Sequence, residues 1–118
     1  MYIIFFVLDN ANLLDQVLDT WTKIGIAGIT INESIGIARR QRRLLPIHLT
    51  YSLSEFKEEG NYTLWAIVKE KDLIKKCLTV TEKITGDLNT PNTGVFAAWS
   101  LDITKGITKK NSKQDKEQ

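Results

Sequence analysis

Four arginines lie within five positions in the first half of the chain, at Arg39, Arg40, Arg42 and Arg43, and every other basic side chain apart from His48 is a lysine. A guanidinium is planar and can bind a carboxylate or a phosphate through two parallel hydrogen bonds, which the point charge of a lysine does not do. The cluster therefore predicts an anion site or a docking surface. A solvated charge run that keeps a loop extended is the alternative interpretation.

The stretch before the arginines has the pattern of a β-strand. Apolar and small or polar residues alternate with period two from residue 28 to 37, which puts two different sets of side chains on the two faces of a strand. The apolar set is Ile29, Ile31, Ile35 and Ile37, and the other set is Thr30, Asn32, Ser34 and Gly36. We therefore expect the arginines to come directly after a strand.

The rest of the chain contains few residues that could act in catalysis or bind a metal. His48 has no second histidine or cysteine near it, and the lone Cys77 excludes an internal disulfide and a cysteine-built metal site. No paired carboxylates and no nucleophile with a neighbouring base occur at a useful spacing. The sequence thus predicts no enzyme, no metal site and no catalytic residue.

Length and charge restrict the remaining classes. The 118 residues suffice for a single domain with a core, which we place at residues 1–106, followed by a disordered polar tail at 107–118. The net charge is +2, but residues 105–118 contribute five lysines against Asp115 and Glu117, so the body of the chain is near −1. A body of that charge does not favour a nucleic-acid partner.

The start of the chain runs directly into an apolar stretch, with no charged region or cleavage site of a secretory leader. The longest apolar runs, such as Tyr2–Leu8, are too short to cross a bilayer. We therefore expect a cytoplasmic protein.

Periodicity predicts four strands and two helices. The strands are expected at 2–8, about 28–37, 62–69 and 95–103, and the helices at 12–24 and, capped by Asp72, at 72–84. A long loop at about 38–61 joins the second and third strands, and a turn-rich loop occupies 85–94. We expect the long loop to be the most mobile internal segment.

An internal repeat defines the architecture. The apolar stripe of the second helix equals that of the first plus sixty residues, with Thr81 in place of Trp21, and the first and third strands repeat at the same offset. Two matching halves predict an α+β fold, a ferredoxin-like β-α-β-β-α-β sandwich with both helices on one face of an antiparallel sheet. Trp21 and Cys77 lie on the inner stripes and are predicted to be core residues.

Three of the strands are apolar on both faces, although the helices can cover only one. This applies to Phe5-Phe6 and to the segments 64–67 and 95–99. Apolar patches of that size are rare on soluble monomers, so another subunit is expected on the second face.

In three segments, taken in order, the sequence resembles the P-II signalling family. The segments are Ile24–Ile31, Gly36–Arg39, and Thr85-Gly86 leading to Val95-Phe96. They match the family's turn from the first helix into the second strand, the base of its long T-loop, and the start and end of its phosphate-binding B-loop. The resemblance covers nearly all of residues 1–106.

The resemblance implies a homotrimer with clefts between its subunits for a small anionic effector, an adenine nucleotide in that family. It further implies control of a transporter or enzyme through the long loop. Together with the arginine cluster, it assigns nine ligand-binding residues: Thr30, Gly36, Ile37, Arg39, Arg40, Gly86, Asp87, Thr93 and Gly94. Three residues are assigned to docking of the regulated partner: Arg42, Arg43 and Tyr51.

The sequence departs from the family in the second loop, where 89–94 reads Asn-Thr-Pro-Asn-Thr-Gly and lacks the usual lysine. The identity of the effector therefore stays open. Two other classes stay open as well: an RNA-binding module of the same topology, with Tyr62 and Trp65 as stacking residues, and a small enzyme on a ferredoxin-like scaffold.

Overall fold

The computed structural model describes residues 1–35 and 60–108, and every structural statement concerns those residues. Four strands and two α-helices follow one another in a β-α-β-β-α-β order, with a short 3-10 helix before the first α-helix. The elements are β1 (Tyr2–Leu8), η1 (Ala11–Leu13), α1 (Leu14–Lys23), β2 (Thr30–Ser34), β3 (Asn61–Val68), α4 (Lys71–Thr85) and β4 (Gly94–Ser100).

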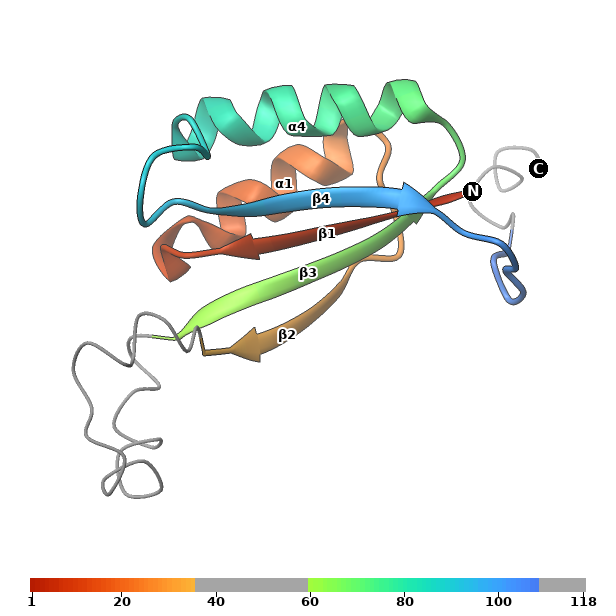
Figure 1. Ribbon diagram of the computed structural model, residues 1–118, viewed down its shortest axis with the longest axis horizontal. Coiled ribbons are helices and arrows are strands. Elements are labelled where there is room, and N and C mark those ends of the chain that lie inside the picture. Colours follow the sequence, from red (N-terminus) through yellow and green to blue (C-terminus); the bar gives the residue numbers. More distant parts are fainter. Residues whose placement is uncertain (36–59, 109–118) are drawn as a thin grey trace, which may run out of the picture.

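The strands form one antiparallel sheet in the order β2-β3-β1-β4, and α1 and α4 lie together on one face of it (Figure 1). This confirms the predicted ferredoxin-like fold. The register places Phe5 of β1 between Trp65 of β3 and Ala97 of β4, and pairs Trp65 with Thr30 of β2. The two central strands, β1 and β3, are the two that the repeat relates.

The repeat in the sequence is a repeat in space. Val17 of α1 and Cys77 of α4, sixty residues apart, are both fully buried, and so are Trp21 and Thr81. At the position where the second stripe has a threonine in place of the tryptophan, the indole Nε1 of Trp21 donates a hydrogen bond of 2.9 Å to Oγ1 of Thr81. Trp21 and Cys77 are thus core residues, as predicted.

Each helix begins with a different kind of residue. Asn10 caps η1 by accepting a hydrogen bond from the Asn12 amide, as expected of an asparagine before a helix. The prediction that Asp72 caps the second helix is wrong, because Glu70 is the N-cap and makes no side-chain cap bond. Asp72 lies in the first turn instead, where a carboxylate is stabilised by the positive end of the helix dipole.

The two faces of the sheet differ in cover. Side chains facing the helices form the core, namely Ile4, Phe6, Leu8, Leu64, Ala66 and Val68, together with Val17, Trp21, Ile26 and Cys77. The opposite face, here called the open face, has the apolar side chains Ile3, Phe5, Val7, Trp65, Ile67, Val95, Ala97 and Trp99, with the polar Thr63 paired with Val7. β1, β3 and β4 are therefore apolar on both faces, as predicted.

Strand boundaries depend on the partner strand as well as on the pattern of one strand. β2 ends at Ser34, opposite the first residue of β3, Asn61, so Ile35 is not part of the strand and Asn61 is not part of the loop. β4 ends at Ser100, opposite the first residue of β1, and not at Ile103 as predicted. Ile37, the arginine cluster and almost all of the predicted long loop lie outside the described residues.

Candidate functional site

A turn between α1 and β2 positions Thr30, the first of the predicted ligand-binding residues. At the end of α1 the amides of Gly25 and Ile26 donate to the carbonyls of Thr22 and Trp21, and the buried Ile26 side chain anchors the turn in the core. Gly25 and Gly28 have φ of 102° and 67°, values that favour glycine. The chain then enters β2 with Thr30 exposed at its first position.

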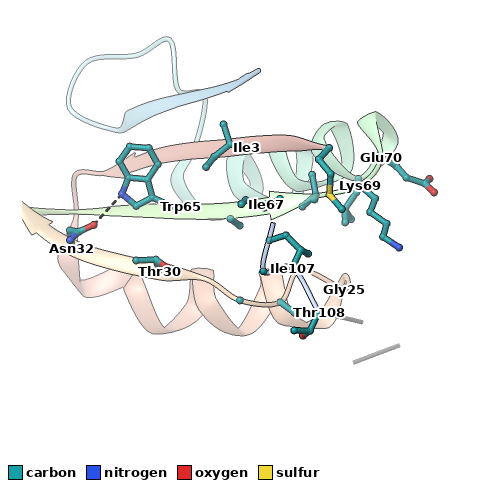
Figure 2. Close-up of a pocket in the computed structure, with 17 residues that line it drawn as sticks. Ile3, Gly25, Thr30, Asn32, Trp65, Ile67, Lys69, Glu70, Ile107 and Thr108 are labelled. Atoms are coloured by element: carbon teal, nitrogen blue, oxygen red, sulfur yellow. Dashed lines mark hydrogen bonds between the residues drawn. The ribbon is translucent and has the colours of Figure 1, made fainter. Parts of the chain in front are cut away.

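Thr30 lines the large cavity of the described chain, with a volume of about 920 Å³ (Figure 2). The cavity lies on the open face, between the ends of three strands, the α1–β2 turn and the segment that comes after β4. Its walls include Ile3, Gly25, Ala27, Gly28, Asn32, Trp65, Ile67, Lys69, Glu70, Ile107 and Thr108. Most of these walls are apolar or backbone, and the polar groups are few, which is the usual composition of a small-molecule site.

Trp65 forms a rigid wall at one end of the cavity. Its Nε1 donates a hydrogen bond of 3.1 Å to Oδ1 of Asn32, and its ring centroid lies 5.0 Å from that of Phe5 (Figure 2). These two contacts hold the indole from two sides. The side-chain NH₂ group of Asn32 keeps its donors available to a ligand, because the hydrogen bond to Trp65 uses its oxygen.

Lys69 and Glu70 lie at the other end of the cavity and bring charge to it (Figure 2). The Lys69 ammonium can bind a carboxylate or a phosphate. The amides of Ala27 and Gly28 make no hydrogen bond to any residue that the structure describes. An anion in this cavity would therefore meet one ammonium group and two backbone donors, with the carboxylate of Glu70 as an opposing charge.

The loop from Gly86 to Gly94 contains four of the predicted ligand-binding residues. The amides of Leu88, Asn89 and Thr90 are already bonded within the loop and helix, to the carboxylates of Glu82 and Asp87 and to the Asp87 carbonyl, at 2.9 Å each. The Thr93 hydroxyl donates to the Thr90 carbonyl at 2.8 Å. A phosphate on this loop would have to use other donors or open these bonds.

The structure does not bring together, within one chain, the five predicted ligand-binding residues that it describes. Thr30 lies on β2 and the loop 86–94 leads into β4, and these are the two outer strands of the sheet. Three strand spacings, about 14 Å, separate them. The other predicted residues, Gly36, Ile37, Arg39, Arg40, Arg42, Arg43 and Tyr51, lie outside the described residues.

The described residues give no indication of a reactive cysteine, a metal site or a membrane-spanning helix. Burial raises the pKa of the Cys77 thiol to about 12, against the opposing effect of its hydrogen bond to Thr81, so the thiol is protonated at neutral pH and a poor nucleophile. Within residues 1–35 and 60–108, no three His, Cys, Asp or Glu side chains are grouped to hold a metal ion. None of the helices in these ranges is long and apolar enough to cross a membrane.

Tyr62 and Trp65, the pair considered for stacking on RNA, lie on opposite faces of β3. Tyr62 pairs with Leu8 on the helix side, whereas Trp65 pairs with Phe5 on the open face. Residues three apart in a strand point to opposite faces, so these two rings do not form one stacking platform.

Four walls of the cavity were not predicted from the sequence as parts of a site: Gly25, Gly28, Asn32 and Lys69. The signal in the sequence was the pair of glycines before the second strand, since two close glycines indicate a turn with left-handed residues. Nothing in the local sequence of Lys69 shows that the end of β3 lies beside that turn.

The comparison with solved structures supports the fold. A crystal structure of a protein from Thermus thermophilus, provisionally described as a PII-like signalling protein, matches with a TM-score of 0.55 and 14% identity. The match covers 85% of this chain and 84% of that chain. No protein-family model and no curated protein matches the sequence. The chain therefore shares the fold of a PII-like protein.

Proposed function

We propose that the chain is a non-catalytic, PII-like regulatory protein that binds a small anionic effector in clefts between the subunits of a homotrimer. The effector class that fits is a compact anion with an apolar part, and an adenine nucleotide belongs to that class. In this proposal, the segment 38–61 docks on the regulated transporter or enzyme. On the basis of the sequence, we assign binding of the effector to Arg39 and Arg40. Contact with the partner is assigned to Arg42, Arg43 and Tyr51.

The observation that carries the proposal is the cavity at Thr30. It combines a fixed aromatic wall at Trp65, a carboxamide at Asn32, an ammonium group at Lys69 and the backbone of a glycine turn. β2 connects this cavity directly to the segment that contains the arginine cluster. Binding at one end of β2 could therefore bias the conformation of the segment attached to its other end.

The open face supports the assembly. Val95 and Trp99 of β4 are 55% and 48% exposed, next to the half-buried Phe5 of the central strand. Association of copies through this face would bury these side chains. It could also bring the loop 86–94 of one copy toward the Thr30 cavity of another, which a single chain does not do.

Light scattering on the purified protein tests this assembly. We expect a mass of about three times the 13.4 kDa of the chain. Trp99→Asp should shift the protein to the monomer, because the charge would have to be buried in the interface. The matched control is Thr79→Asp on the exposed side of α4, which should leave the mass unchanged. A monomeric wild type at micromolar concentration would contradict the trimer.

A thermal-shift screen with ATP, ADP, AMP, cyclic nucleotides and bicarbonate tests the effector, because a ligand that binds only the native state raises its apparent stability. With a ligand found in this way, Lys69→Ala should weaken binding by about tenfold or more, since a hydrogen bond to a charged group contributes about 1.5–3 kcal/mol.

The matched control for that titration is Lys76→Ala, an exposed lysine of α4 outside the cavity. Calorimetry should give the control variant the affinity of the wild type. Equal affinities for both variants would remove the cavity at Thr30 from the proposal.

A further inference from the structure

The residues after β4 continue the pattern of a strand without a partner. From Leu101 to Thr108, Ile103 and Ile107 alternate with polar residues and glycine. The Leu101 amide donates to the Met1 carbonyl, and beyond it no residue to Thr108 makes a hydrogen bond within the described chain. Ile103 is 86% exposed. This segment is half-apolar, and no hydrogen bond pairs it beyond Leu101 with any residue that the structure describes.

The outer edge of β2 is the least covered strand edge of the sheet. Four of its five residues are exposed, whereas most of β4 at the other edge is at least partly buried. Ile31 in the strand and Ile35 just after it are each 38% exposed. An edge with free backbone groups and exposed isoleucines is a template for another strand.

The two unpaired segments match residue for residue. Ile31, Glu33 and Ile35 alternate along the edge of β2, and Ile103, Lys105 and Ile107 alternate along the segment after β4. When the isoleucines are placed opposite one another, parallel or antiparallel, the central glutamate lies opposite the central lysine.

Both kinds of cross-strand pair stabilise sheets, since β-branched side chains pack together and opposite charges attract. The matching pattern of isoleucines and opposite charges indicates that the segment after β4 is the strand that pairs with the β2 edge. We propose that Ile103–Ile107 of one copy adds as a strand to the outer edge of β2 of a second copy, with Lys105 opposite Glu33.

The same chain cannot make this pairing, because Ile103 follows the last residue of β4 too closely. Ser100 lies at the sheet end marked by Val68, whereas Ile31 pairs with Leu64, four residues along and three strands across. That separation is about 19 Å, and three extended residues reach only about 10 Å. A second copy must supply the edge.

Gly106 allows the segment to follow the edge as far as Ile107. It has a φ of 91°, and its surroundings are open. Glycine populates both positive and negative φ readily, so the residue can turn into the extended region on pairing. Thr104 and Gly106 would then lie on the face shared with Asn32 and Ser34.

This pairing joins the segment after the edge strand β4 of one copy to the other edge strand, β2, of the next copy. Two different surfaces therefore meet, so it is a head-to-tail contact. Such contacts close into rings when the rotation permits, which is compatible with a trimer. Ile107 also lines the cavity at Thr30. The contact would therefore link the wall of that cavity in one copy to the β2 edge of the next.

Disulfide trapping tests the register. In the double variant Glu33→Cys, Lys105→Cys, facing residues on paired strands come within disulfide distance, so mild oxidation should give covalent dimers and larger species on non-reducing gels. The native Cys77 is fully buried and does not interfere. Both substituted side chains are exposed, so the fold should be retained, which circular dichroism checks.

The matched control is Glu33→Cys, Thr104→Cys, in which the second cysteine moves one residue and points to the opposite face of the strand. It should cross-link about tenfold more slowly, because its Cβ vectors point apart. Cross-linking at equal rates in the two variants, or in neither, would overturn the pairing. Light scattering of the wild type against Trp99→Asp separately reports association through the open face, so the two ideas can fail independently.

Discussion

Replacing Trp21 with alanine is expected to lower the free energy of unfolding by about 3–5 kcal/mol, the usual range for loss of a large buried aromatic side chain. Trp21 is fully buried between the helices and the sheet, and its ring lies 5.9 Å from that of Phe6. Alanine would leave a cavity at the centre of the core. Urea denaturation at a fixed protein concentration measures the change.

The hydrogen bond of Trp21 can be tested separately from its volume. Thr81→Val keeps the shape of the side chain but removes the acceptor of the Trp21 Nε1 bond, so the buried indole N–H loses its partner, at about 1–3 kcal/mol. Thr79→Val, two residues away and exposed, is the matched control and should stay within about 0.5 kcal/mol of the wild type. Equal stability of the two valine variants would show that the bond contributes nothing.

The fold could be predicted because its evidence is periodic and occurs twice. Each helix has an apolar stripe, and the two stripes coincide at an offset of sixty residues, which gives two equivalent halves. The pair Trp21 and Thr81 looks like a mismatch of that repeat, because a hydroxyl-bearing residue takes the place of a large aromatic one. In the structure it is a complementary contact, which a pattern taken from each helix alone does not show.

The strand ends were mispredicted for a different reason. Ile35 continues the alternation of β2, and Leu101 and Ile103 continue that of β4, but both strands end where the partner strand ends. Pairing is a contact between distant parts of the chain, whereas alternation is local. The residues left over are those that we assign to pairing between copies.

The candidate site was predicted only in part. Thr30 lies in the cavity as one wall, but the contributions of Lys69 and the glycine turn depend on which strand ends meet. For the loop 86–94, the sequence indicated a turn-rich loop, and the family resemblance implied that it binds phosphate, which would require free amides. The carboxylates of Glu82 and Asp87 bind two of those amides, and side-chain acceptors of this kind cannot be assigned from spacing alone.

Gly94, predicted to contact the effector, is expected to be essential to the fold itself. It is the first residue of β4, its φ is 149°, and a Cβ at this position would collide with the carbonyl oxygen of Val7 on the paired strand. Gly94→Ala should therefore lower the free energy of unfolding by about 2 kcal/mol or more, because a strained backbone alone costs about 1–3 kcal/mol.

Gly86→Ala is the matched control for this substitution. Gly86 has a φ of 88°, but nothing lies within 4 Å of an added Cβ, so alanine there meets backbone strain without a collision. Urea denaturation should thus rank the wild type above Gly86→Ala and Gly86→Ala above Gly94→Ala. If Gly94→Ala keeps wild-type stability and loses affinity for the effector, the glycine serves the ligand and not the approach of β4 to β1. Equal losses in the two variants would show that the Val7 contact relaxes freely.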